Sequence, residues 1–423
     1  MSLLSVQKSS LYLFLFELGF GIQLQIIGQI SVSELFLLAY IPLYVLPGIN
    51  WKKEKELLTI TKAYVLLLGF QVLSECIVGN VLANALKGLA ITVVSYFHFV
   101  YLTVMLTKQQ SLIAVLILAK ICNSLIFDTE IEEQSLEDVM QGQAAAYLKF
   151  HVAPIAILTC LYMSLLFRNK DFSRLLSLLG IVLVGLGARS SGALAFGAGL
   201  LAYVMGHPDL LQHKKKFRTV CILSIAGCYA LYAYYVHEVL SGGITSGNSW
   251  QLFLCPHPYN PIELLLVGRS EMWVGLQAFM DSFWFGHGAW PYDTDGRYEL
   301  MLLELHGLSG PNIRLSSDFV IPSHSVWIGS GMMNGIFAFA TMGYIVYFFL
   351  KRGWTAIMHS EKTYQLVLSY FMLDLFWTAF FSPQSHFRWS MPIAFALLFV
   401  MYNVSKKDTA DRELNLKPDD NHE

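Results

Sequence analysis

The chain has 423 residues, of which 55% are hydrophobic and 14% are charged, and its mean hydropathy is +0.52. A soluble protein carries charges at roughly a quarter of its positions. These proportions therefore exclude a soluble globular protein, a disordered chain and a disulfide scaffold. The net charge of −2 offers no basic excess for binding nucleic acid. We predict an all-α polytopic membrane protein that forms a single integral membrane domain over residues 1–423.

Twelve apolar segments approach the roughly 20 residues that a helix needs to cross a bilayer. They are predicted near residues 10–28, 31–47, 61–79, 88–106, 111–127, 148–167, 175–190, 191–207, 218–237, 325–350, 363–381 and 389–405. The seventh and eighth segments form one continuous apolar run that is too long for a single span. Arg189 lies in the middle of this run, so we expect a hairpin that turns there and brings the arginine to a water surface.

The lysines and arginines of short loops predict on which side of the membrane each loop lies. With the N-terminus in the cytoplasm, most basic residues fall in cytoplasmic loops, including those of "WKKEK" and "HKKKFR". A tail over residues 406–423 then also lies in the cytoplasm. Twelve spans with both ends in the cytoplasm agree with this distribution.

One long loop, over residues 238–323, falls on the outer side of the membrane. Loops of this length are usually folded or functional. This loop contains two helical patterns, over residues 261–283 and 297–308, and Pro261 suits the first position of a helix. We expect the loop to be partly helical and to form a cap against the outer ends of the bundle.

The outer side also carries arginines. An arginine binds phosphate oxygens through a rigid, permanently charged fork, so several of them indicate a site for an anionic group. They are Arg189, Arg269, Arg297, Arg314 and Arg388. Each can instead pair with a loop carboxylate or reach lipid headgroups. Arg189 has no acidic neighbour in the sequence. Arg269 has Trp273, on which it can stack, and Glu271, with which it can pair.

His324 is the most informative histidine. It lies in "IPSHSVW", where the chain enters the tenth segment, and the preceding Pro-Ser pair fits a helix start. We therefore expect His324 in the first helical turn, near the outer surface. There it can take a proton from a hydroxyl group, or it can simply bond to the backbone. His287 and His386 are weaker candidates, and Asp293–Asp295 is either a metal-binding triplet or an ordinary turn.

Three motifs resemble a known superfamily. In "HSVWIGSGMMNG", nine residues separate Ser325 from Gly335, which is similar to the His-[Asn/Ser/Gln]-x9-Gly signature of bacterial O-antigen ligases. The related lipid-linked polysaccharide polymerases carry close variants. "GRSEMWVGLQAFMDSFWFGHGAW" and "GARSSGALAFGAGLLAYV" resemble two further hallmarks, an arginine before a loop helix and an arginine at an outer hairpin. With motifs, the resemblance covers roughly residues 175–350.

The resemblance implies an inverting glycosyltransferase of the bacterial inner membrane, with its active site facing the periplasm. Besides membrane lipids, the implied partners are a glycan on undecaprenyl diphosphate as the donor and a glycan or the lipid A core as the acceptor. No cofactor and no metal ion is implied. His324 would deprotonate the acceptor hydroxyl, and Arg189 and Arg269 would bind the diphosphate. The accessory candidates are Arg314, Arg388 and His287.

Two alternatives stay open. A ligase transfers the glycan to the lipid A core, whereas a polymerase transfers a growing chain to the next lipid-linked repeat. Ala338 occupies a position at which the superfamily usually has Gly, Thr or Tyr, and with the compact loop this favours a polymerase. A transporter or flippase of lipid-linked sugars is the second alternative. Against it, charged residues are scarce within the predicted spans, where Lys120 is the main exception.

Overall fold

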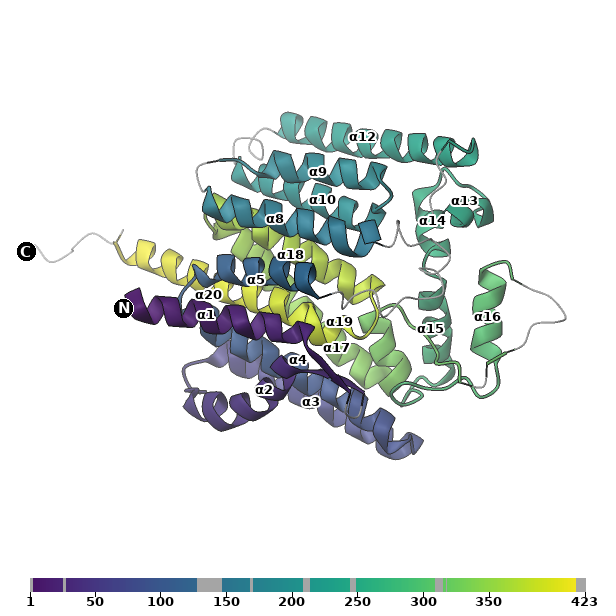
Figure 1. The fold of residues 1–423 in the computed structure, drawn as a ribbon, viewed down its shortest axis with the longest axis horizontal. Coiled ribbons are helices and arrows are strands. Elements are labelled where there is room, and N and C mark those ends of the chain that lie inside the picture. The colour runs from purple at the N-terminus through teal and green to yellow at the C-terminus, as the bar shows by residue number, and fades with distance from the viewer. Residues whose placement is uncertain are drawn as a thin grey trace, which may run out of the picture.

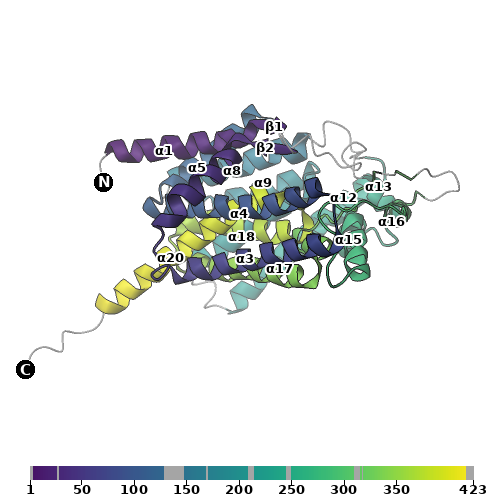
Figure 2. The same ribbon diagram turned by 90° about the horizontal axis from the view of Figure 1, so that it is seen from below.

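The structure is a computed structural model that describes residues 3–25, 28–127, 147–167, 170–207, 214–243, 249–308, 315–316 and 318–415. Long helices lie side by side in a bundle, and shorter helices gather at one end of it (Figures 1 and 2). The bundle helices are α1 (Leu3–Leu18), α2 (Val32–Tyr40), α3 (Lys55–Val78), α4 (Leu82–Lys108), α5 (Leu112–Ile126), α8 (Ala153–Leu166), α9 (Ser173–Gly185), α10 (Arg189–Gly206), α12 (Lys214–Leu240), α17 (Val326–His359), α18 (Lys362–Phe381) and α20 (Met391–Asn415). Each predicted apolar segment overlaps one of them, which confirms the helical fold class.

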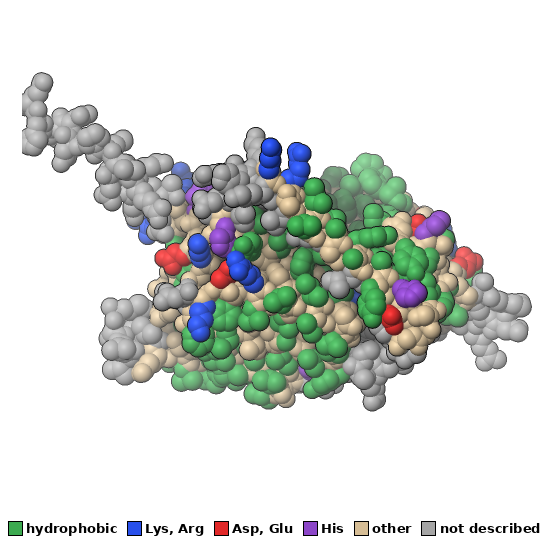
Figure 3. All heavy atoms as spheres, turned by 90° about the horizontal axis from the view of Figure 1, so that it is seen from above, with side chains coloured by type: hydrophobic (Ala, Val, Ile, Leu, Met, Phe, Trp, Pro, Cys, Tyr) green, Lys and Arg blue, Asp and Glu red, His purple; other side chains and the backbone are tan. Residues whose placement is uncertain are grey.

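Six helices in these ranges are long and apolar enough to cross a membrane: Lys55–Val78, Leu82–Lys108, Leu148–Leu166, Val326–His359, Lys362–Phe381 and His386–Lys407. Three shorter apolar helical segments cover Val32–Gly48, Leu112–Ile126 and Ser173–Gly185. Lysine and arginine side chains gather toward the end of the molecule at which both termini lie, and the middle of the visible face is mainly hydrophobic (Figures 1 and 3). These features are typical of a membrane protein. The presence of twelve spans stays a prediction.

The first predicted segment, 10–28, does not continue as one helix. α1 ends at Leu18, and β1 (Gln23–Gln25) then pairs antiparallel with β2 (Gln29–Ser31). A Cβ on Gly21 would lie 2.1 Å from the ring of Phe127, so a larger side chain would not fit at this position. The chain packs closely against Phe127 just beyond the end of α1, and the prediction of a single span through residue 28 was wrong.

The predicted hairpin at Arg189 is confirmed. α9 ends at Gly185, α10 begins at Arg189, and Gly187 provides the positive φ of +100° that the turn requires. The two helices touch through glycines. A Cβ on Gly180 would lie 2.5 Å from a backbone nitrogen of α10, and one on Gly199 would lie 2.4 Å from a backbone oxygen of α9. Small residues allow such close packing of apolar helices, and the packing holds Arg189 at the end of the hairpin.

α17 is not the unbroken span that was predicted over residues 325–350. Gly335 has a φ of 79° and a ψ of −173°, which interrupts the helix. The loop segment 283–288 crosses α17 at this break, where the Ile336 backbone N–H donates to the Phe283 carbonyl oxygen over 2.9 Å. A Cβ on Gly335 would lie 2.0 Å from the Trp284 carbonyl oxygen. The glycine of the motif therefore lets the loop rest directly on the helix backbone.

The described parts of the loop at 238–323 fold into short helices at the end opposite the termini (Figure 1). They are α13 (Ser249–Leu254), α14 (Pro261–Val267), α15 (Ser270–Asp281) and α16 (Arg297–Leu305). The pattern over 261–283, which was predicted as one helix, is two helices separated at Gly268 and Arg269. α15 packs on α17, where Val274 and Phe279 join Met332 in a small apolar cluster.

Candidate functional site

A cavity of about 490 Å³ lies between the α9–α10 hairpin, α12 and the loop helices. Its lining includes Arg189, Arg269 and Lys149, so the structure brings together two arginines that are far apart in the sequence. Among the described residues, no aspartate or glutamate lines this cavity, which we call the arginine cavity. Most of its remaining wall is apolar and includes Ile181 and Phe196. Three cations on apolar walls favour an anion that also carries an apolar part.

Arg189 is held from two sides. Its Nη2 donates to Gln251 Oε1 of α13 over 2.9 Å, and its Cζ lies 5.7 Å from the ring centre of Tyr235 on α12. Gln251 is itself buried. Because these contacts fix the guanidinium, Arg189 would lose little conformational entropy on binding an anion.

Arg269 occupies the N-cap position of α15, and its Cζ lies 5.5 Å from the ring centre of Trp377 on α18. Trp273 was the expected stacking partner, but a tryptophan from another helix takes that position. Glu271, the alternative partner, lies 3.7 Å from His324. The positive end of the α15 dipole lies beside Arg269 and adds to the positive potential around it.

Lys149 is the third cation of the arginine cavity, and sequence reasoning missed its role. It belongs to the π-helical turn η4 (Leu148–Val152) before α8, and its Nζ lies 4.5 Å from the ring centre of Phe150. Gln251 and Trp377 were also missed. Nothing in their local sequence indicates a site, because each reaches the cavity only through the packing of helices that are distant in the chain.

His324 lies just before α17 and not in its first turn, which corrects the prediction. The helix begins at Val326, and His324 has a φ of +38°, which is uncommon for a residue with a side chain. Its Nδ1 lies 3.7 Å from Glu271 Oε1, with 24% of the histidine side chain and 8% of the glutamate side chain exposed. Strained residues of this kind cost about 1–3 kcal/mol and cluster at functional sites.

Ser325 fixes the backbone that carries His324. Its Oγ accepts from the Ile328 backbone N–H and donates to the Ala379 carbonyl oxygen of α18, each over 3.1 Å. On the other side, a Cβ on Gly275 of α15 would lie 2.8 Å from Ser323 Cα. The segment is therefore held between α15 and α18. His324 is outside the lining of the arginine cavity, but α15 joins the two, because it carries both Arg269 and Glu271.

A second histidine also contacts α15. His306 Nε2 lies 2.5 Å from Ser270 Oγ, directly beside Arg269. Burial lowers the pKa of His306 below its ordinary value of 6.5, although the nearby Glu271 carboxylate opposes this effect. The neutral imidazole is therefore favoured at physiological pH.

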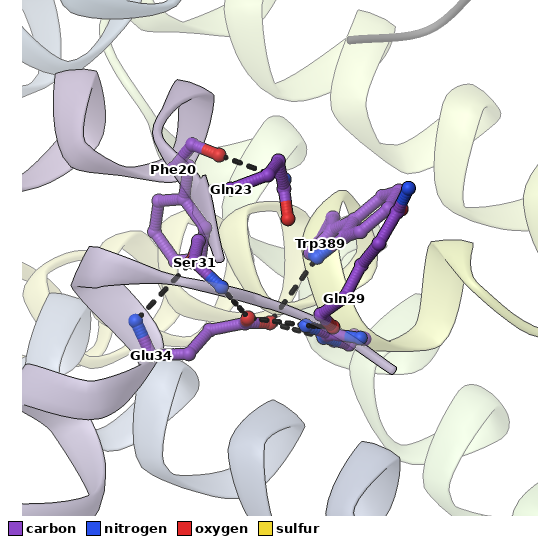
Figure 4. A network of polar contacts seen from close by, with 7 residues as sticks. Phe20, Gln23, Gln29, Ser31, Glu34 and Trp389 are labelled. Carbon is purple, nitrogen blue, oxygen red and sulfur yellow. Dashed lines mark hydrogen bonds and ion pairs between the residues drawn. The ribbon is translucent and has the colours of Figure 1, made fainter. Parts of the chain in front are cut away.

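Arg388 has a structural partner. Its guanidinium forms a two-pronged ion pair with Glu34, whose side chain is fully buried, and Nη2 donates to the Gln29 carbonyl oxygen over 2.8 Å (Figure 4). The same carboxylate accepts from Trp389 Nε1 over 3.2 Å and from the Ser31 backbone N–H over 2.7 Å. The network ties β2 and α2 to α19 (His386–Trp389). Because Glu34 already neutralises Arg388, the predicted accessory role in anion binding is not supported.

His287 is likewise engaged by the fold. Its backbone N–H donates to the Met332 carbonyl oxygen over 2.9 Å, and its Nε2 lies 2.8 Å from the Ala278 carbonyl oxygen. A carbonyl oxygen can only accept, so Nε2 carries the proton and holds the loop against α15. The accessory role of His287 stays a prediction. His386 Nδ1 lies 3.0 Å from Ser390 Oγ.

The remaining predicted polar groups have local partners. Asp293 accepts from the Tyr298 and Glu299 backbone N–H groups over 2.7 and 2.8 Å, so the "DTD" triplet caps α16. Arg297 pairs with Asp281 over 3.0 Å. Among the described residues, no group of three His, Cys, Asp or Glu side chains could hold a metal ion. Arg314 lies outside the described residues.

No model of a known protein family matches the chain, and no curated protein sequence matches it. The geometry of the site therefore carries the functional conclusion. Its elements are three cations in a largely apolar cavity and one helix that leads from them to a strained histidine beside a buried carboxylate.

Proposed function

We propose that the protein is an inverting glycosyltransferase of the O-antigen ligase and polymerase type. It transfers a glycan from undecaprenyl diphosphate to an acceptor sugar hydroxyl. The observation that carries this proposal is that Arg189, Arg269 and Lys149 line one cavity that α15 links to the His324–Glu271 pair. A diphosphate on a polyprenyl chain combines several negative charges with an apolar tail, and the arginine cavity offers cations on apolar walls.

In this reaction the acceptor oxygen forms a bond to the anomeric carbon, and the bond from that carbon to the diphosphate oxygen breaks. The hydroxyl proton passes to His324, and the diphosphate leaves with the electron pair. Fixed positive charge near the leaving oxygens stabilises the charge that develops there. Arg189, Arg269 and Lys149 supply that charge from side chains, which supports a metal-independent reaction.

Glu271 acts as a positioning residue for His324. Its carboxylate lies 3.7 Å from Nδ1, and in the proposed reaction Nε2 is the nitrogen that takes the proton of the acceptor hydroxyl. Once His324 has taken the proton, a carboxylate at this distance stabilises the imidazolium by about 4 kcal/mol at an effective dielectric constant of roughly 20. The pair therefore resembles the base and orienting carboxylate of other proton-transfer sites in its roles.

Within this class we favour a polymerase. We also propose that the protein lies in the inner membrane with its site at the periplasmic face. Basic side chains gather at the end of the bundle that carries the termini (Figure 3), and the arginine cavity lies at the opposite end of the α9–α10 hairpin. An excess of lysine and arginine marks the cytoplasmic side of a membrane protein, which supports this orientation.

The test uses purified protein and a lipid-linked oligosaccharide. Release of undecaprenyl diphosphate should require an acceptor and should continue in EDTA. His324→Ala should abolish release, whereas His359→Ala, a change at the opposite end of α17, should not. Arg189→Lys loses the planar fork and should lower the rate by about tenfold or more, whereas Arg174→Lys should leave it unchanged. Full activity of folded His324→Ala protein would refute the proposal.

Ligase and polymerase are separated in cells. Loss of a polymerase leaves only single repeats, whereas loss of a ligase leaves finished polymer on the carrier lipid. We expect the single-repeat pattern on a gel, and undiminished polymer on the carrier would favour the ligase.

A transporter of lipid-linked sugars is the second candidate, and one observation favours it. Glu17 and His98 form a buried pair between α1 and α4, with 3.4 Å between Oε1 and Nε2, and ionisable residues inside apolar helices mark ion pathways. Glu17→Gln should disable an ion-coupled transporter but should leave glycosyl transfer by a correctly folded enzyme intact. The same reconstituted preparation can be assayed for both activities.

A further inference from the structure

A second cavity, of about 200 Å³, lies at the other end of the α9–α10 hairpin from the arginine cavity. It is formed where α8 and α10 end and where α9 and α18 begin, and we call it the basal cavity. The polar side chains that line it include Lys170, Asp171, His207, Lys362, Thr363 and Gln365. Nothing in the proposed transfer reaction uses these residues, because the two cavities share no lining residue and lie toward opposite ends of α10.

The basal cavity has a positive charge balance. Lys170 and Lys362 face a single carboxylate, that of Asp171, which gives a net charge of about +1 with His207 neutral. The N-terminus of α18 also opens here, because Lys362 and Thr363 are its first residues and its N-cap residue forms no side-chain capping bond. The backbone N–H groups and the dipole at such an end favour an anion.

Gln365 indicates a second property of a ligand in the basal cavity, namely a hydrogen-bond donor. The residue is 6% exposed, and its Nε2 donates to the Ile357 carbonyl oxygen over 3.1 Å, which fixes the orientation of the amide. Its Oε1 has no hydrogen-bond partner among the described residues. Oε1 lies 3.6 Å from the place that a Cβ of Gly206 would occupy, and Gly206 also lines the cavity. An acceptor of this kind beside the cavity can bond to a donor that lies next to the anionic group of a ligand.

Exposed apolar side chains lie close in the sequence to residues that line the basal cavity. Leu166, Phe167 and Leu175 are 52%, 45% and 51% exposed, and Lys170 Nζ lies 5.4 Å from the ring centre of Phe167. Exposed apolar residues beside a basic cavity suit a ligand with acyl chains. The volume is below the roughly 300–1,000 Å³ of typical sites for larger small molecules, so it fits a lipid headgroup better than a nucleotide.

We propose that the basal cavity binds the headgroup of an anionic phospholipid whose phosphodiester carries a hydroxyl group, as in phosphatidylglycerol. The phosphate, with one negative charge, lies between Lys170, Lys362 and the start of α18, and the headgroup hydroxyl donates to Gln365 Oε1. A zwitterionic headgroup would leave the net positive charge of the cavity uncompensated. The site recognises both the charge and the hydroxyl, and the acyl chains lie along the exposed apolar flank.

The charge requirement is tested by native mass spectrometry of the full-length protein in detergent, titrated with phosphatidylglycerol or phosphatidylcholine. Wild-type protein should retain one phosphatidylglycerol at concentrations at which it retains no phosphatidylcholine. Lys170→Ala/Lys362→Ala should weaken this binding by about tenfold or more. The control Lys215→Ala/Lys351→Ala removes the same charge elsewhere and should change it less than about twofold. Equal affinity of the two double variants would overturn the proposal.

The hydroxyl requirement is tested with phosphatidylmethanol, an anionic phosphodiester without a headgroup donor. Wild-type protein should prefer phosphatidylglycerol to phosphatidylmethanol, and Gln365→Leu should abolish that preference while it leaves the binding of phosphatidylmethanol unchanged. Equal binding of both lipids to wild-type protein would refute recognition by Gln365. Soluble glycerophosphoglycerol distinguishes the source of the headgroup, because displacement of the lipid at equal concentration would show that the ligand is a soluble phosphodiester and would overturn the lipid assignment.

Discussion

Gly335→Ala gives a direct test of the crossing between the loop and α17. Alanine would have to adopt a φ of 79° and a ψ of −173°, a conformation that is essentially restricted to glycine and costs about 1–3 kcal/mol. The new Cβ would also lie 2.0 Å from the Trp284 carbonyl oxygen. One of the two segments must therefore move.

That movement breaks the backbone hydrogen bonds that hold the loop on α17. They run from Ile336 N to Phe283 O, from His287 N to Met332 O and from Gly288 N to Met333 O, over 2.8 to 2.9 Å. Each contributes about 1 kcal/mol. Together with the backbone strain, loss of these bonds predicts that Gly335→Ala destabilises the protein by about 4–6 kcal/mol.

The matched control is Gly69→Ala in α3, where an added Cβ meets nothing within 4 Å. Alanine is favoured over glycine inside a helix by about 1 kcal/mol, so this variant should be slightly more stable than the wild type. Unfolding in detergent, followed by tryptophan fluorescence, measures both variants. Equal unfolding temperatures for the two variants would refute the reasoning about the crossing.

Two further predictions concern stability. Glu34→Ala leaves the Arg388 guanidinium, which is 17% exposed, without its carboxylate, and should cost about 3–5 kcal/mol in the unfolding assay. Adding Arg388→Met should recover much of that loss, and a double variant as unstable as the single one would contradict the pairing. The second prediction concerns His306. Because its pKa is lowered in the folded state, the unfolded state binds more protons near the ordinary value of 6.5. The stability contributed by neutral His306 is therefore present above that pH and lost as the pH falls below it. His306→Gln should flatten the dependence of unfolding temperature on pH between about 7.5 and 5, and an unchanged slope would rule out this assignment.

Hydropathy predicted where the long helices lie, because burial in lipid or in the bundle demands continuous apolar sequence. It did not predict where they break. The end of α1 depends on Gly21 meeting Phe127, and the interruption at Gly335 depends on a loop that arrives from 50 residues earlier in the chain. Both are contacts between distant segments, which a local pattern does not record.

The candidate site also combines features that local sequence predicts with contacts between distant segments that it does not. An arginine at a predicted hairpin and an arginine before a loop helix were identifiable from local sequence, and the structure brings Arg189 and Arg269 to one cavity. Gln251 and Trp377 reach these arginines only through packing. The ion pair of Arg388 with Glu34 also joins segments at opposite ends of the chain, so local sequence did not identify which carboxylate pairs with that arginine.

Arg269 and Glu271, which belong to different parts of the candidate site, are connected through α15. Arg269 is the N-cap residue of α15, a helix of 12 residues, and Glu271 lies in its first turn, so a movement of α15 shifts the backbone of both residues. In the proposed reaction, a displacement of α15 would therefore affect both the cavity that Arg269 lines and the contact of Glu271 with His324. The binding of the diphosphate and the orientation of the proposed base would then both depend on the position of a single helix.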